Sequence, residues 1–347
     1  MRKTLCLVIP TLKAGGSERV AAELLNFAVS KGIHCHLILM VSKPLFYKLD
    51  DRVVIHQPSI TTKNKFRYYL KVLFFVRNTL KEINPSSVFC LGYKIIPAIA
   101  TIGCDFRLVG SHRTSPYRRW RPFEGNSLTQ KAFGMVYSLI NNWAIRKYVA
   151  MIMQSEEAVS VLRQYYSDKC EFKVIPNFIR PINSYEVIPK NRIICVGRLS
   201  KEKGQRFLLK AFARLEDKGW ELYIVGAGPQ REKLEELAIE LNIAKNVTFT
   251  GFQSEIDKYL QTAKIFVLPS LIEGFPNALL EAMANGLACV SFDCKTGPSI
   301  LIEDGINGFL VPVKDIDQLT KKIQLLIDCP DIRKKISAMS KKVKIEY

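Results

Sequence analysis

Two glutamates flank a short glycine–proline segment in the second half of the chain. They are Glu273 and Glu281, and the sequence between them begins Gly-Phe-Pro-Asn. An apolar run, 265–268, ends at a proline just before this segment, so we expect a strand that turns here into a helix. Pro276 is expected at the first helical position, where proline fits because the N–H there has no helical partner.

The start of this helix has the chemistry of a phosphate site. The N–H groups of a first turn point out of the helix and carry a partial positive charge. Those expected to be free belong to Phe275, Asn277 and Ala278. Amides that hold a diphosphate, with an acid on either side, predict a nucleotide-sugar site. The ordinary alternative is that Glu273 only complements the helix dipole and that Glu281 is a helix-face glutamate.

Two cations flank another expected strand-to-helix turn. Arg198 and Lys203 follow the apolar run 192–196, close to the start of the next helix. A cation is unfavourable there unless an anion is bound. Arginine is the better planar diphosphate clamp and lysine the better point charge. We therefore interpret this pair as anion-binding, against the alternative of solvated surface charge.

The first half offers three further candidates. Gly15 and Gly16 follow an apolar strand and precede a helix expected to be capped by Ser17, so a phosphate can approach the backbone closely. This is not the dinucleotide G-x-G-x-x-G pattern. His112 follows an expected strand, 107–110, and is a candidate hydrogen-bond donor to a sugar hydroxyl. The alternative for it is an ordinary surface-loop histidine.

A basic and aromatic helix is expected over 65–81. At helical spacing, one stripe is apolar and contains Phe66, Leu70, Leu73 and Phe74. It is either an ordinary amphipathic helix or a helix lying on an anionic leaflet. The basic residues that are candidates for acceptor or membrane contacts, here and in an arginine-rich loop, are Lys63, Arg67, Lys71, Arg113, Arg118 and Arg119.

Repeated strand–helix units with apolar strands predict an α/β protein with two doubly wound, Rossmann-like domains. The expected domains are 1–180 and 181–347, joined by a proline-containing linker within 175–190. The glycine-rich turns follow strands, so they are expected to face a cleft between the two domains. Residues 1–180 carry 27 Lys and Arg against 11 Asp and Glu, whereas 181–347 carry 24 against 21, so the net charge of +19 lies mostly in the first half. That half is expected to meet an anionic partner.

Nine cysteines without a C-x-x-C pair indicate reduced thiols in the cytoplasm. No His/Cys cluster has metal-ligand spacing and no D-x-D lies between the expected strands, so no metal cofactor is expected. No apolar run approaches the roughly 20 residues that span a bilayer.

These motifs resemble glycosyltransferase family 4, retaining enzymes of the two-Rossmann GT-B architecture. The segments that carry the resemblance are 15–19, 196–204, 225–229, 269–284 and 303–312. The resemblance implies a role for each matching residue. Arg198 and Lys203 correspond to the donor diphosphate clamp, Gly16 approaches the same diphosphate, and the amides of 275–278 hold it. Glu281 is the implied ribose ligand, while Glu273 and His112 lie beside the transferred sugar.

Thr296-Gly-Pro-Ser299 and the basic loop are most similar to family members that extend undecaprenyl-diphosphate-linked glycans. The implied reaction moves a hexose or N-acetylhexosamine of the Gal, GalNAc or Glc type from a UDP-sugar to a lipid-linked saccharide in O-antigen, capsule or similar synthesis. The implied location is the inner face of the cytoplasmic membrane, as a peripheral protein. The chain ends at Tyr347, so the family's returning C-terminal helix is expected to be shortened.

Two other functions fit parts of the pattern. A GT-B-like UDP-sugar 2-epimerase would share the donor site, but it needs no strongly basic half. A nucleic-acid-binding protein would use the +19 charge, but the sequence contains no recognisable RNA or DNA module. We therefore expect no nucleic-acid partner.

Overall fold

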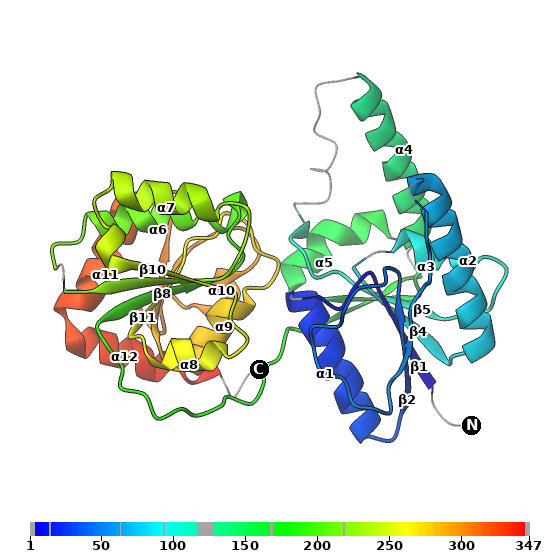
Figure 1. Ribbon diagram of the computed structural model, residues 1–347, viewed down its shortest axis with the longest axis horizontal. Coiled ribbons are helices and arrows are strands. Elements are labelled where there is room, and N and C mark those ends of the chain that lie inside the picture. The colour runs from blue at the N-terminus through cyan, green and yellow to red at the C-terminus, as the bar shows by residue number, and fades with distance from the viewer. Residues whose placement is uncertain are drawn as a thin grey trace. The chain divides into compact units, whose positions relative to one another are not determined.

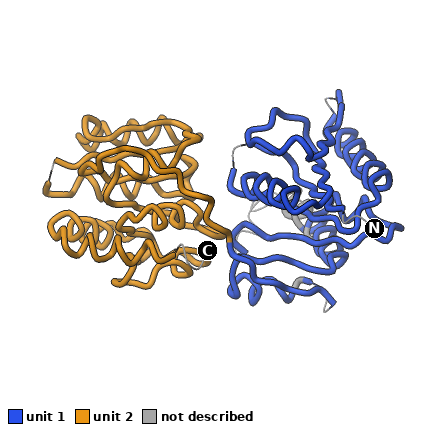
Figure 2. The backbone as a smooth tube through the Cα atoms, turned by 90° about the horizontal axis from the view of Figure 1, so that it is seen from below, with its two compact units in different colours: residues 1–176 blue, residues 177–347 orange. Residues whose placement is uncertain are grey.

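The chain folds into two compact α/β units (Figures 1 and 2). The computed structural model describes residues 4–13, 15–62, 64–92, 94–116, 128–166, 169–217 and 219–343, with the side chains of 128–134 and 138 excepted. Unit 1 is Met1–Pro176 and unit 2 is Asn177–Tyr347, so the division falls four residues before the expected one.

Unit 1 contains a seven-stranded, wholly parallel sheet in the order β3-β2-β1-β4-β5-β6-β7. Its strands are β1 (Thr4–Ile9), β2 (His34–Leu39), β3 (Val54–His56), β4 (Ser87–Leu91), β5 (Leu108–Ser111), β6 (Ala150–Met153) and β7 (Glu171–Val174). Its helices are α1 (Gly16–Ser30), α2 (Lys65–Ile83), α3 (Ile95–Ala100), α4 (Leu128–Ile145) and α5 (Glu156–Leu162), the last continued by the 3-10 helix Arg163–Tyr165. Strand β7 has no counterpart among the expected strands.

Unit 2 contains a six-stranded parallel sheet in the order β10-β9-β8-β11-β12-β13. Its strands are β8 (Arg192–Val196), β9 (Glu221–Val225), β10 (Val247–Gly251), β11 (Ile265–Leu268), β12 (Ala288–Phe292) and β13 (Phe309–Val311). Its helices are α6 (Gln205–Ala213), α7 (Arg231–Glu240), α8 (Ile256–Gln261), α9 (Asn277–Ala284), α10 (Pro298–Leu301), α11 (Ile316–Asp328) and α12 (Pro330–Ser340), with 3-10 helices at Lys201–Lys203 and Ala244–Asn246.

Helices cover both faces of each sheet, which explains why the central strands β1, β4, β8 and β11 are mostly apolar (Figure 1). Along β11, Ile265 and Val267 belong to one buried cluster, while Phe266 and Leu268 belong to the other. Successive side chains of a strand point to opposite faces, so both faces of this strand lie in apolar cores.

The strand order reverses between β1 and β4 in unit 1, and between β8 and β11 in unit 2. In open parallel sheets, ligands bind at such switch points, beyond the carboxyl ends of the strands. The topology therefore singles out the loops after these four strands.

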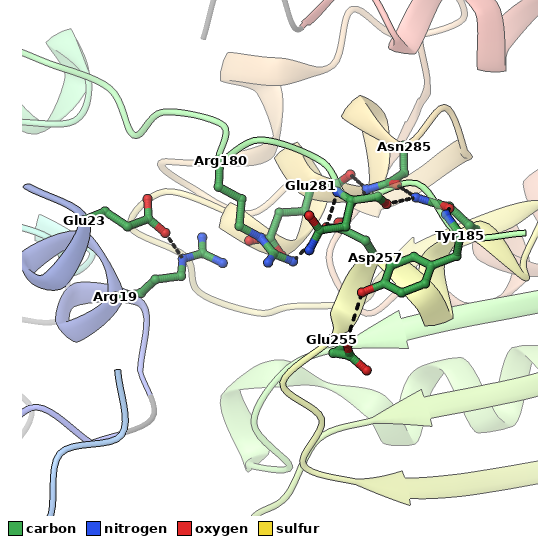
Figure 3. Close-up of polar contacts among 10 residues, drawn as sticks. Arg19, Glu23, Arg180, Tyr185, Glu255, Asp257, Glu281 and Asn285 are labelled. Carbon is green, nitrogen blue, oxygen red and sulfur yellow. Dashed lines mark hydrogen bonds and ion pairs between the residues drawn. The ribbon is translucent and has the colours of Figure 1, made fainter. Parts of the chain in front are cut away.

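Residues 177–190 of the expected linker belong to unit 2, where polar groups of this segment are bound to α8 and to Glu255 just before it (Figure 3). Arg180 forms a 3.2 Å ion pair with the buried carboxylate of Asp257. The N–H of Tyr185 donates to Gln261 Oε1 at 2.9 Å, and its hydroxyl donates to Glu255 at 3.2 Å. These contacts explain why unit 2 begins before residue 180.

Candidate active site

Lys203 and Glu273, which were predicted on two separate turns, are in direct contact in unit 2. Lys203 Nζ lies 2.7 Å from Glu273 Oε1. The glutamate side chain is 7% exposed and the lysine side chain 28%. The two residues are 70 positions apart, but they follow β8 and β11, which are neighbours at the switch point. The topology thus places a cation and a buried acid side by side beyond the strand ends.

Gly204 packs the loop that carries Lys203 tightly against the turn after β11. Its φ is +66°, and a Cβ at this position would lie 2.0 Å from the carbonyl oxygen of Pro269. The N–H of Leu271 donates to the carbonyl of Glu202 at 2.8 Å. A glycine is therefore required here by both conformation and space, and the close packing fixes the backbone on which Lys203 is mounted.

Glu273 is supported on its other side by Thr296 and Gly297. The buried hydroxyl of Thr296 donates to the carbonyl of Glu273 at 2.8 Å. A Cβ on Gly297 would lie 2.9 Å from Cβ of Glu273. The Thr-Gly-Pro-Ser segment, noted in the sequence as a subgroup feature, thus acts in the structure as a support for the acidic residue.

The start of α9 differs from the prediction in two ways. Pro276 is the N-cap with ψ of 76°, and the first helical residue is Asn277. The N–H of Asn277 donates to the carbonyl of Phe275 at 3.0 Å, so it is not a free donor as expected. The tight turn at Pro276 brings these two groups together. Within the described part of the chain the N–H of Ala278 has no acceptor, so this predicted amide is available.

Glu281 and the side chain of Asn277 are the polar groups of α9 that were singled out in the sequence. Glu281 lies in α9 and is 7% exposed, so it is not the solvent-facing glutamate of the alternative reading. Asn277 Oδ1 accepts a short hydrogen bond from Asn177 Nδ2, at the beginning of unit 2. Phe275 is buried in the core beneath the turn. Carboxylates thus stand on both sides of the turn, as predicted.

Arg198 is exposed, and among the described residues its guanidinium has no hydrogen bond or ion pair. Its backbone is nevertheless fixed, because Gln205 Nε2 donates to its carbonyl at 3.0 Å. An unpaired guanidinium on an ordered backbone is suited to binding an anion.

Two buried thiols lie close to the Lys203–Glu273 pair. Burial raises the pKa of the Cys195 thiol to about 12, with Lys203 lowering it and Glu273 raising it in part. The pKa of Cys294 is also raised to about 12, mainly by burial and then by Glu273. Both thiols are protonated at neutral pH, so neither is a nucleophile.

In unit 1, Gly15 is held by a residue that the sequence did not indicate. The hydroxyl of Tyr47 accepts from the N–H of Gly15 at 3.1 Å and donates to its carbonyl at 2.9 Å. The expectation that Ser17 caps α1 is wrong, because Gly15 is the N-cap and has no side-chain cap. A Cβ on Gly15 would lie 2.3 Å from the carboxylate of Glu18, whose pKa is raised by burial. Gly16 is the first helical residue and is exposed.

His112 and Arg113 line a cavity of about 300 Å³ in unit 1. The pKa of Arg113 is lowered by burial to about 10. Lys94 Nζ lies 3.0 Å from His112 Nδ1 and donates to the hydroxyl of Tyr166 at 2.8 Å. Lys94 and Tyr166 were missed in the sequence, since they are 18 and 54 positions from His112 and belong to no motif. The other lining residues are Ser17, Gly92, Ile95, Ser111, Thr114, Tyr137, Asn141, Ile145 and Leu162.

Of the basic surface candidates, Lys63, Arg118 and Arg119 lie outside the described residues. Arg67 and Lys71 are exposed on α2. None of the helices in the described segments is long and apolar enough to cross a membrane. These segments also hold no group of three or more His, Cys, Asp or Glu that is arranged for a metal.

Residues 14–181 match the family described as Glycosyltransferase Family 4, and residues 184–343 match Glycosyl transferases group 1. The chain belongs to the family 4 glycosyltransferases. The glycosyltransferase is 29% identical to the Campylobacter jejuni N-acetylgalactosamine-N,N'-diacetylbacillosaminyl-diphospho-undecaprenol 4-alpha-N-acetylgalactosaminyltransferase, over 94% of this chain and 91% of that one. It is 24% identical to the Escherichia coli UDP-Gal:alpha-D-GlcNAc-diphosphoundecaprenol alpha-1,3-galactosyltransferase, over 90% and 85%.

The glycosyltransferase has the GT-B fold. It is similar to sucrose-phosphate synthase from Thermosynechococcus elongatus with a TM-score of 0.81 at 17% identity, over 99% of this chain and 94% of that one. At this identity the similarity concerns the fold alone.

Proposed function

We propose that this glycosyltransferase moves a hexose or N-acetylhexosamine from a UDP-sugar to a lipid-diphosphate-linked saccharide, with retention at the anomeric carbon. The observation that carries the proposal is the Lys203–Glu273 contact at the switch point of unit 2, next to the turn that begins α9. The names of the Campylobacter and Escherichia relatives support the lipid-linked acceptor, and the latter name supports UDP as the donor nucleotide.

The donor diphosphate is assigned to the cations of unit 2. Arg198 offers a guanidinium that has no partner among the described residues, Lys203 an ammonium already oriented by Glu273, and Ala278 an N–H at the start of α9. Charge-assisted hydrogen bonds of this kind strengthen as negative charge develops on a leaving group. These groups take the part of a divalent metal, so no metal cofactor is proposed. Glu281 is assigned to the ribose.

The proposed transfer follows a front-face path. The bond from the anomeric carbon to the diphosphate breaks, and its electron pair goes to the phosphate oxygen. The acceptor hydroxyl oxygen forms the new bond on the same face and gives its proton to the departing diphosphate. Glu273 is engaged by Lys203 at 2.7 Å, which favours an electrostatic role over that of a covalent nucleophile.

Unit 1 is assigned to a membrane-borne acceptor, because helices α2 and α4 have apolar residues exposed to solvent. On α2, Phe66 is 72% exposed and Phe74 is 59% exposed, next to the basic residues Arg67 and Lys71. The exposed apolar residues of α4 are Met135, Val136, Leu139, Ile140 and Trp143. Apolar side chains mixed with Lys and Arg are typical of a helix that lies in an anionic interface. The proposed location is the inner face of the cytoplasmic membrane.

The test is a matrix of UDP-sugars against undecaprenyl-diphosphate-linked saccharides, read by mass spectrometry. We expect one donor–acceptor pair to give a product heavier by one sugar residue, and the Arg198→Ala protein to give far less of it. NMR of the new anomeric centre reports retention or inversion. Interconversion of a UDP-sugar without acceptor, or salt-sensitive DNA binding without transfer, would contradict the proposal.

A further inference from the structure

The contact between Lys94 and His112 in the unit 1 cavity bears on which ring nitrogen of His112 carries the proton. Lys94 follows β4 and stands at the N-cap of α3, while His112 directly follows β5. The two strands are neighbours in the sheet, so both residues lie beyond its carboxyl edge. Lys94 Nζ and His112 Nδ1 are 3.0 Å apart, which is hydrogen-bonding distance.

Both partners of this contact are anchored. Lys94 Nζ also donates to Tyr166 Oη at 2.8 Å, and the carbonyl of Lys94 accepts from the buried Tyr148 hydroxyl at 2.9 Å. The N–H of His112 donates to the carbonyl of Ile152 at 3.0 Å. Tyr166 therefore holds the lysine ammonium beside the imidazole and Tyr148 holds the lysine backbone, unlike in a mobile surface lysine.

The chemistry of the two groups decides which of them donates. A lysine ammonium has three N–H donors and no acceptor, so the ring nitrogen that it meets must be the acceptor. A neutral imidazole that accepts at Nδ1 carries its proton at Nε2. The opposite arrangement needs a neutral lysine amine, which is the minor form of lysine at neutral pH.

We propose that Lys94 is a positioning residue that holds His112 as a neutral imidazole with its proton on Nε2. His112 then acts as a hydrogen-bond donor to a sugar oxygen and not as a general base. The inference rests on the proposed function, because it names what His112 offers to the saccharide. Thr114 Oγ1 stands 3.4 Å from Nε2, so the donor points towards polar groups of the cavity.

The lining of the cavity includes two cations, Lys94 and Arg113, and its other polar side chains fit an oxygen-rich ligand. Its lining combines hydroxyl and amide side chains, among them Ser17, Thr114 and Asn141, with apolar walls at Ile145 and Leu162. Sugar hydroxyls and N-acetyl carbonyls both accept hydrogen bonds, and either can replace the long contact to Thr114. A histidine without a net charge orients such an oxygen without requiring an anion.

Long-range ¹H–¹⁵N NMR of protein labelled in its histidine rings tests the proton assignment directly. The chain has four histidines, at 34, 36, 56 and 112, and His112→Gln identifies the signals of the last. At neutral pH we expect His112 to show an unprotonated Nδ1 and a protonated Nε2. In Lys94→Met we expect both ring nitrogens to shift towards the averaged values of a tautomer mixture. The exposed Lys43→Met should leave them unchanged.

A protonated Nδ1 in the unmodified protein would overturn the inference, and so would an unchanged His112 spectrum in a folded Lys94→Met protein. If Lys94→Met does not fold, Lys94→Arg replaces it, and this variant must keep Nδ1 as an acceptor. In transfer assays we expect Lys94→Met to lower kcat/KM by about tenfold to a hundredfold, with partial recovery in Lys94→Arg. If the tautomer is as stated but His112→Gln transfers sugar normally, the proposed sugar contact fails while the role of Lys94 in setting the tautomer stands.

Discussion

Lys203 and Glu273 form an ion pair that links the ends of two neighbouring parallel strands, with the acid almost completely buried. The pair has a structural as well as a chemical consequence. A buried carboxylate that loses its paired cation costs more free energy than the intact pair contributes. The loss of activity in a Lys203 variant therefore has to be separated from a loss of stability.

Lys203→Met is expected to lower the free energy of unfolding by about 2–3 kcal/mol, less than for a fully buried pair because the lysine is partly exposed. The double variant Lys203→Met/Glu273→Gln should recover at least half of this loss, because no charge is left buried. Both proteins should lose sugar transfer.

Urea unfolding measures the change in stability, and initial rates measure the loss of transfer. Lys334→Met, which breaks an exposed pair with Asp331, is the control and should stay within about 0.5 kcal/mol of the parent. Equal stability of the single and double variants would show that the pair does not shield Glu273.

Arg198→Ala should affect transfer with little effect on folding. The side chain is exposed and has no ion pair within the described segments, so the free energy of unfolding should change by about 0.5 kcal/mol or less. A lost hydrogen bond to a charged group costs about 1.5–3 kcal/mol, which corresponds to a tenfold to hundredfold fall in kcat/KM. Arg198→Lys should recover part of it. Lys210→Ala, also exposed, is the matched control. Normal transfer by Arg198→Ala would remove Arg198 from the diphosphate site.

Gly204→Ala should be strongly destabilising, because the new methyl group would overlap the carbonyl oxygen of Pro269. Gly305 is the control, since its φ of +77° is similar but nothing lies within 4 Å of its Cβ position. Gly305→Ala should cost about 1 kcal/mol from backbone strain alone, and Gly204→Ala at least about 2 kcal/mol more. Thermal unfolding distinguishes them. Similar melting temperatures would mean that the loop after β8 can move away from the turn after β11.

Exposed residues of α2 should control binding to anionic vesicles. Arg67→Glu/Lys71→Glu should weaken binding to phosphatidylglycerol-containing vesicles by at least about tenfold, because each basic residue near such a surface contributes about 1 kcal/mol. Phe66→Ser/Phe74→Ser should weaken binding by removing apolar contact. Lys233→Glu/Lys245→Glu changes the net charge equally from exposed sites in unit 2 and should have little effect. Equal losses in the two charge-reversed proteins would indicate a response to net charge and not to α2. Vesicle co-sedimentation measures the difference.

The sequence was sufficient to predict the parallel sheets and the glycine-rich turns that follow their strands. Continuous apolar runs such as 265–268 identify buried strands, and the glycine-rich turns follow them. Local rules failed where a distant residue decides the conformation. Ser17 is a good N-cap by type, but Tyr47 binds the backbone of Gly15, which is the N-cap, and the helix begins at Gly16.

Contacts between side chains on different loops could not be predicted in this way. Glu273 and Lys203 meet because β8 and β11 are adjacent, and one sequence does not determine strand order. The same holds for Lys94 and His112, which follow adjacent strands in unit 1. Residue types indicated the chemistry at each loop, and the topology decided which groups became partners.

The attachment of residues 177–185 to unit 2 has a further consequence. Arg180, Asn183 and Tyr185 are bound to side chains of Glu255, Asp257 and Gln261, so this segment belongs to the packing of unit 2. A junction between Pro176 and Asn177 cuts none of these bonds. Hybrid enzymes that exchange whole halves with a relative at this junction should therefore keep both cores intact. Such hybrids would show whether the choice of donor and the choice of acceptor are determined by different halves of the chain.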